Sequence, residues 1–205
     1  EEIFGLGGTF GRETKGETVL LPRLRTSLER LNPSLPPEAL SQAIDQLTRD
    51  RSAMSLVAAN REVYGLLKDG IEVTVADATS GGQEPERVRI IDWDNPLAND
   101  FLLVSQLSVT GSLYTRRPDL VGFVNGLPFV VIELKKPGVP AQQAFDDNLT
   151  CYKADIPQLF WFNSLMIASN GTESHIGSLT ADWERFFEWK RIEREDEPRR
   201  VSLEV

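Results

Sequence analysis

The chain has 205 residues, of which 40% are hydrophobic and 26% charged, and its formal net charge is −9 at pH 7. This length suits one domain with a real hydrophobic core, and the apolar content excludes a disordered chain. No run of about 18 apolar residues and no signal-peptide pattern is present, so we expect a cytoplasmic protein with no membrane contact. The acidic balance argues against a protein that holds nucleic acid by bulk charge alone, but it is compatible with an acidic, metal-binding active site.

The chain contains one cysteine, Cys151, and one histidine, His175. A single cysteine cannot form an intramolecular disulfide or a thiolate zinc site. A single histidine excludes a histidine-rich metal site.

The first 69 residues divide into an irregular segment and a helical part. Residues 1–19 are rich in glycine and show no usable periodicity, so we expect no regular element there. Residues 20–69 contain leucines at helical spacing before Asn32-Pro33, a second helical pattern after Pro36-Pro37, and a third from Leu56 to Leu67.

Residues 70–192 carry the pattern of an α/β core, and residues 193–205 that of a charged linker or tail. The apolar runs predict strands at Gly70–Val75, Val88–Trp93, Phe101–Val109, Leu120–Val124, Phe129–Leu134 and Ser164–Ser169, with a helix at Pro140–Lys153. This order indicates an α/β fold with a mixed sheet flanked by helices. Four later aromatic residues recur at helical spacing, which favours core packing over a partner surface: Trp183, Phe186, Phe187 and Trp189.

Three ionisable residues lie at the ends of two neighbouring predicted strands. Asp119 precedes one strand, and Glu133 and Lys135 end the next, where alternation places both on the same face as Val131. A carboxylate and an amine at the end of an apolar strand are costly unless they have partners or a function. Two adjacent carboxylates suit a hard divalent cation such as Mg²⁺.

Strand register tests this idea. A two-residue loop at Asn125-Gly126 would place Asp119 opposite Ile132, on the face away from Glu133. A three-residue loop would place Asp119 opposite Val131, diagonal to Glu133 with Cβ atoms roughly 7–8 Å apart. The metal hypothesis therefore predicts an odd loop or a β-bulge, and an unbroken two-residue hairpin would contradict it.

Pro118-Asp119 followed by Glu133-Leu134-Lys135 resembles the PD-(D/E)xK nuclease core. Further segments resemble the N-terminal nuclease domain of the R subunit of type I restriction-modification enzymes, over about residues 20–192. They are Leu31–Pro36, Ile91–Pro96, Asn99–Phe101, Arg117–Leu120, Asn125–Pro128, Val131–Pro137, Ile156–Phe160, Ser169–Gly171 and Gly177–Ala181. The catalytic motif alone is short, and it is the combination that is specific.

The resemblance implies a restriction-endonuclease-like fold and a type I site-specific deoxyribonuclease that hydrolyses DNA phosphodiester bonds in restriction of foreign DNA. Asp119 and Glu133 would bind Mg²⁺ together with the Leu134 carbonyl, and Lys135 would orient or activate the attacking water. Implied partners are double-stranded DNA and the specificity and methylation subunits of a restriction complex. ATP would serve only the motor of the full subunit, whose motifs this chain lacks.

Five residues are predicted to contact DNA. Arg116, Arg117 and Lys136 could meet backbone phosphates. Asn148 and Tyr152 occupy the place of the family's Gln-x3-Tyr motif, with a side chain one methylene shorter at the first position. Because residues four apart share a helix face, Asn148 would make either a DNA contact or a structural hydrogen bond.

Two alternatives remain open at this stage. The fold could serve a non-catalytic module that clamps DNA or docks a subunit, or a structure-specific repair nuclease, which the segments outside the motif disfavour. Asp92 could also approach the metal, and the further acidic residue that the family carries on a leading helix has no evident counterpart.

Overall fold

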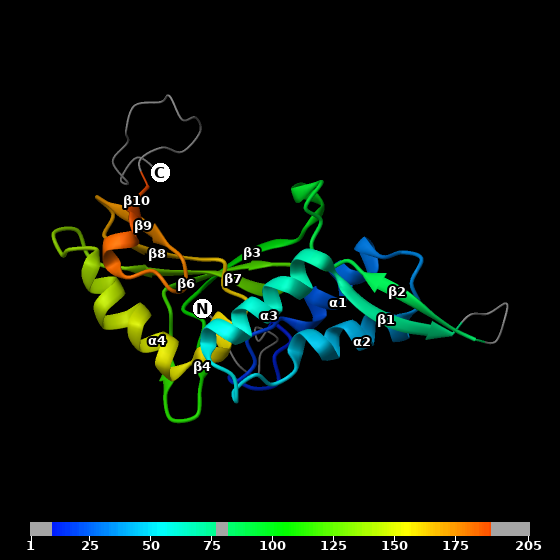
Figure 1. Cartoon of the computed structure of the whole chain (residues 1–205). Helices are drawn as coiled ribbons and strands as arrows, with labels where there is room; N and C mark the ends of the chain where they lie inside the picture. Colours follow the sequence, from blue (N-terminus) through cyan, green and yellow to red (C-terminus); the bar gives the residue numbers. More distant parts are fainter. Residues whose placement is uncertain (1–9, 77–81, 190–205) are drawn as a thin grey trace.

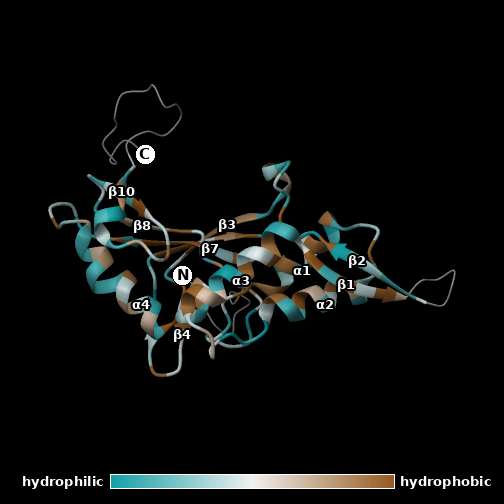
Figure 2. Ribbon diagram, in the orientation of Figure 1, coloured by the Kyte–Doolittle hydropathy of each residue, from teal (hydrophilic) through white to brown (hydrophobic). Residues whose placement is uncertain are grey.

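The computed structural model describes residues 10–76 and 82–189. Three amphipathic helices open the fold: α1 (Leu21–Leu31), α2 (Pro37–Thr48) and α3 (Leu56–Asp69). Prolines occupy the first turns of α1 and α2, where a missing N–H removes no helical hydrogen bond. Figure 2 shows both teal and brown along these helices, because one side of each is buried. The helices predicted for this region are confirmed.

An antiparallel hairpin follows, formed by β1 (Ile71–Ala76) and β2 (Gln83–Val88). The Gln42 side chain on α2 donates to the Thr74 carbonyl at 3.0 Å, which ties the helix to this hairpin. The three helices and the hairpin share one hydrophobic core at one end of the molecule (Figure 1).

A six-stranded mixed sheet forms the other part, in the order β10-β9-β8-β7-β6-β3. Its strands are β3 (Phe101–Ser105), β6 (Leu120–Val124), β7 (Leu127–Leu134), β8 (Leu165–Ser169), β9 (Ser174–Gly177) and β10 (Phe187–Glu188). Only β7 and β8 pair in parallel among these strands. Their crossover contains a π-helical turn, Ala144–Leu149, that continues into α4 (Thr150–Asp155). The mixed α/β fold predicted from the sequence is confirmed.

Short elements complete the described chain. A small hairpin pairs β4 (Val109–Thr110) with β5 (Thr115–Arg116). Single 3-10 turns lie at Pro96–Ala98, Pro157–Phe160 and Trp183–Arg185. No helix in residues 10–76 and 82–189 is both long enough and apolar enough to cross a membrane.

The two faces of the six-stranded sheet differ. The helical crossover ending in α4 lies against one face (Figure 1), where Val131 and Leu149 are completely buried. On the opposite face, Phe101 and Leu103 are each 58% exposed and Leu134 is 44% exposed. Polar groups that project from β7 toward the helical crossover are therefore shielded from water.

Two predicted strands are placed differently. The prediction for Val88–Trp93 is wrong, because β2 ends at Val88. The Asn32 side chain accepts the Arg89 N–H at 2.8 Å and donates to the Arg89 carbonyl at 2.9 Å, as a neighbouring strand would. The strand predicted for Phe101–Val109 divides into β3 and β4.

The C-terminal aromatic residues do not form the predicted helical pattern. A single 3-10 turn is followed by β10. The rings of Trp183 and Phe186 stack with their centroids 5.6 Å apart. Phe186 is buried and Trp183 packs against the same hydrophobic core, which confirms core packing for this pair. Phe187 and Trp189 are 73% and 48% exposed.

The predicted segment boundaries are only partly covered by the described chain. Within residues 1–19, only residues 10–19 are described, and they contain turns without a helix or strand. The predicted tail, residues 193–205, lies outside the described residues.

Candidate functional site

The hairpin between β6 and β7 controls which residues meet. Asn125 and Gly126 both have positive φ, at 51° and 80°, and form a two-residue turn of the kind that right-handed strand twist favours. The register then shifts: Phe123 pairs with Pro128, whereas Gly122 pairs with Val130. The three-residue loop considered from the sequence is therefore wrong, but the predicted bulge is confirmed.

The bulge brings the two predicted acidic residues together. Phe129 is the extra residue on β7, so Leu120 pairs with Ile132. One step further along the ladder places Asp119 directly across from Glu133, on the same face. The Asp119 N–H donates to Glu133 Oε2 at 3.3 Å, which confirms their proximity.

Both carboxylate oxygens of Asp119 already have hydrogen-bond donors. Oδ2 accepts the Leu134 N–H at 2.9 Å. Oδ1 accepts a hydrogen bond from Gln106 Nε2 at 2.7 Å. The carboxylate is therefore held in one orientation at the edge of the covered face.

Glu133 is buried, with only 4% of its surface exposed. Burial, and then the neighbouring Asp119 charge, raise the pKa of Glu133 from 4.5 to about 7. Its Oε1 accepts the Tyr152 hydroxyl at 3.2 Å. Burial likewise raises the pKa of Tyr152 to about 12, so this hydroxyl keeps its proton at neutral pH.

The helical crossover connects Glu133 to Lys135. Lys135 Nζ donates to Asn148 Oδ1 at 2.6 Å, and Asn148 Nδ2 donates to the Tyr152 hydroxyl at 3.2 Å. Asn148 lies in the π-helical turn, a feature often found at functional sites. The prediction that Asn148 and Tyr152 share a helix face is confirmed. Of the two roles considered for Asn148, the structure shows the structural one, because its side chain forms hydrogen bonds to Lys135 and Tyr152.

The basic residues predicted to meet DNA lie in different surroundings. Arg116 forms an ion pair with Asp155, with Nη2 and Oδ2 2.6 Å apart, and stacks over the Tyr114 ring. Arg117 and Lys136 are exposed. The structure thus engages Arg116 at the end of α4 and leaves the other two accessible.

The donor set fits a cation that prefers oxygen ligands. Asp119 and Glu133 supply two adjacent carboxylates, and a positive ion between them would offset the repulsion that arises when both are ionised. Among the described residues no group of three histidine, cysteine, aspartate or glutamate side chains is suited to metal. Asp92 therefore does not join this pair, and its Oδ1 accepts the Asn95 N–H at 3.0 Å.

Sequence reasoning missed one member of the cluster, Gln106. It follows β3 directly and has a positive φ of 56°. A polar residue immediately after an apolar strand was the available signal, but nothing local connects it to Asp119, which lies 13 positions later.

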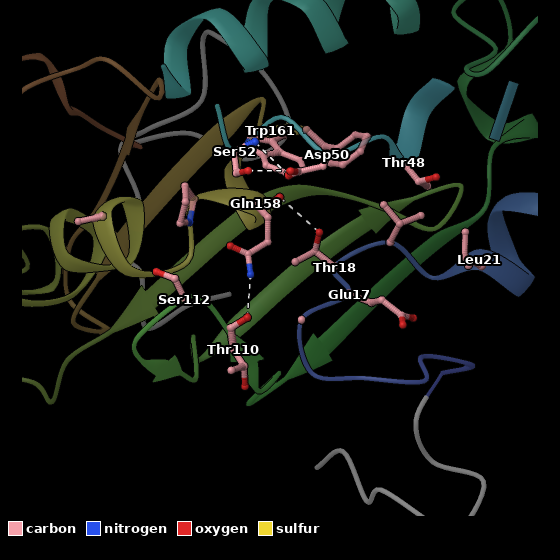
Figure 3. A pocket seen from close by; sticks show the side chains of 16 residues that line it. Glu17, Thr18, Leu21, Thr48, Asp50, Ser52, Thr110, Ser112, Gln158 and Trp161 are labelled. Atoms are coloured by element: carbon pink, nitrogen blue, oxygen red, sulfur yellow. Dashed lines mark hydrogen bonds between the residues drawn. The ribbon is translucent and has the colours of Figure 1, made fainter. Parts of the chain in front are cut away.

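A cavity of about 600 Å³ lies elsewhere and is lined by residues of the N-terminal segment and the β4–β5 hairpin among others (Figure 3). Figure 3 shows Thr18 bonded to the Gln158 carbonyl at 3.3 Å and the Gln158 side chain bonded to the Thr110 carbonyl at 2.9 Å. None of Asp119, Glu133 and Lys135 lines it. The cavity is therefore separate from the acidic cluster.

Comparison with known proteins identifies endonuclease subunits of type I restriction enzymes as relatives. The type I restriction enzyme HindI endonuclease subunit of Haemophilus influenzae is 36% identical over 201 residues, which are 96% of this chain and 19% of the relative. The SsaAORF53P endonuclease subunit of Staphylococcus saprophyticus is 37% identical over 76 residues, 37% of this chain and 8% of that subunit. The EcoprrI endonuclease subunit of Escherichia coli is 27% identical over 159 residues, 76% of this chain and 48% of that protein.

The chain thus spans about a fifth of the length of the HindI subunit. The sequence model of one family, described as Type I restriction enzyme R protein N terminus, matches residues 2–185. This match extends over the helices, the acidic cluster and the six-stranded sheet except β10. The chain therefore belongs to the family of type I restriction enzyme R protein N-terminal domains.

Proposed function

We propose that this domain hydrolyses DNA phosphodiester bonds, using a divalent cation held between Asp119 and Glu133. The observation that carries the proposal is the β7 bulge, which places the two carboxylates on one face next to Lys135. Family membership and relatives named as endonuclease subunits support a nuclease role. A bulge that aims side chains in this way is typical of active sites.

When bound, Mg²⁺ would offset negative charge on the scissile phosphate and lower the pKa of a bound water. Asp119 and Glu133 would hold it, with the Leu134 carbonyl as a further oxygen ligand. Lys135 would donate a hydrogen bond to the attacking water or to the phosphate. Asn148 would keep the flexible lysine side chain directed along the covered face, since it accepts from Nζ at 2.6 Å.

Tyr152 would serve as a positioning residue. Its hydroxyl donates to Glu133 and accepts from Asn148, so it couples the orientation of the carboxylate to that of the lysine partner. Because its pKa lies at about 12, it performs this role as a neutral donor.

DNA would approach from the side of Arg117 and Lys136, which are exposed. The net charge of −9 makes strong binding by this domain alone unfavourable. We therefore infer that the specificity and methylation subunits, and an ATP-driven motor in the rest of a longer R subunit, bring double-stranded DNA to the site.

The test is nicking of supercoiled plasmid by a high concentration of the purified chain with Mg²⁺ or Mn²⁺. We expect EDTA to abolish nicking and Lys135→Ala to slow it by about 100-fold. Lys68→Ala, which removes an exposed lysine on α3, is the matched control and should nick like wild type. Plasmid binding without metal-dependent nicking would overturn the proposal and favour the non-catalytic docking or clamping module.

A further inference from the structure

Gln106 makes two hydrogen bonds to Asp119. Its backbone N–H donates to the Asp119 carbonyl at 2.8 Å, and its side-chain Nε2 donates to Asp119 Oδ1 at 2.7 Å. The first fixes the end of β3 beside the residue that precedes β6. The second places a side-chain amide directly on one carboxylate oxygen.

The backbone at Gln106 is held in an unfavourable conformation. Its φ of 56° lies in the left-handed region, where a residue with a Cβ is disfavoured by roughly 1–2 kcal/mol relative to the right-handed region. Leu107, which follows, is completely buried. Gln106 therefore presents its side chain to Asp119 from a disfavoured backbone conformation.

The two oxygens of Asp119 are not equivalent. Oδ2 is held by the backbone N–H of Leu134, which cannot move without disturbing β7. Oδ1 is held by the side chain of Gln106 alone among the hydrogen bonds described. A cation that binds Asp119 Oδ1 would lie next to the partly positive NH₂ group of the Gln106 amide. The NH₂ group must therefore turn away before the cation can bind.

We propose that Gln106 is a further oxygen ligand of the cation site, reached when its amide turns over and exchanges Nε2 for Oε1. The two ends of a glutamine amide have nearly the same size, so the group that reaches Asp119 as a donor reaches a neighbouring cation as an acceptor. It adds a third side-chain oxygen where the described residues offer no third acidic ligand. This inference rests on the proposed cation site at Asp119 and Glu133.

The test is calorimetric titration of Mn²⁺ into the wild-type chain, Gln106→Ala, Gln106→Glu and Asp119→Ala. We expect Gln106→Ala to weaken Mn²⁺ binding by about tenfold, within the range for lost groups around a metal. Gln106→Glu should tighten it, because a carboxylate supplies an oxygen and a negative charge. Gln142→Ala, which changes an exposed glutamine, is the matched control and should bind like wild type.

The opposite ranking would overturn the inference. If Gln106 only donates to Asp119, Gln106→Ala binds Mn²⁺ as tightly as wild type or more tightly, and Gln106→Glu binds it more weakly through repulsion. Binding lost in Asp119→Ala but unchanged in both Gln106 variants would refute the ligand role and retain the proposed cation site. No Mn²⁺ binding by the wild type would refute both. Circular dichroism melts of each variant identify any loss of fold.

Discussion

Glu133→Gln should stabilise the metal-free protein at alkaline pH. The pKa of Glu133 rises from 4.5 to about 7 in the fold, chiefly through burial and then through Asp119. The folded protein thus holds the Glu133 proton more tightly than the unfolded chain does. Protonation of Glu133 therefore contributes its full stabilisation of the fold below about pH 4.5, and this contribution is lost as the pH rises through about 7. At 1.36 kcal/mol per pKa unit, the wild type loses about 3 kcal/mol over this range through Glu133.

The charged groups that face Glu133 are Asp119 and Lys135, with Tyr152 from the helical crossover. Tyr152 stays protonated throughout, since its pKa lies at about 12. Urea unfolding in EDTA at pH 4.5 and pH 8.5 measures the effect. Glu133→Gln should remove most of the fall in stability between the two pH values.

Glu29→Gln changes an exposed carboxyl on α1 and is the matched control, which should keep the wild-type pH dependence. Equal pH dependence in wild type and Glu133→Gln would refute the assignment of a buried, strained carboxyl at this position. Added Mg²⁺ should restore wild-type stability at pH 8.5 and leave Glu133→Gln much less affected.

Three further substitutions test the packing and the cluster. Gly111→Ala would place a Cβ 1.9 Å from the Asp155 carbonyl oxygen. Urea unfolding should therefore show that the free energy of unfolding falls by about 2 kcal/mol. An unchanged urea midpoint would contradict the close approach of the Gly111 and Asp155 backbones. Arg51→Met removes a completely buried guanidinium that donates to three backbone carbonyls and one carboxylate. Urea unfolding should show that the free energy of unfolding falls by about 3 kcal/mol. An unchanged free energy of unfolding would show that these hydrogen bonds make no net contribution to stability. Asn148→Ala should slow metal-dependent plasmid nicking by about tenfold with little change in stability, whereas wild-type nicking would show that Lys135 needs no partner.

The covered face of β7 could be predicted because it rests on the two-residue period of a strand. That period alone placed Glu133 and Val131 on one face, and the structure buries both. The need for a bulge followed from the same counting, since an unbroken hairpin at Asn125-Gly126 separates Asp119 from Glu133. The location of the bulge at Phe129 did not follow, because it depends on how the two strands pack rather than on a local turn signal.

Errors arose where a side chain from a distant segment satisfied the backbone. Arg89 lies in an apolar run typical of a strand, yet Asn32 takes up both its N–H and its carbonyl, so no strand forms. Gln106 was missed for a similar reason. Its partner Asp119 is brought beside it by the pairing of β3 with β6, and a positive φ at glutamine has no signature in the sequence.

The most direct test of the cation site is an anomalous difference map from crystals of the chain grown with saturating Mn²⁺. We expect a peak in contact with carboxylate oxygens of both Asp119 and Glu133, and no peak there in Asp119→Ala crystals. Full Mn²⁺ density at another position, with the two carboxylates still bonded only to protein groups, would contradict it.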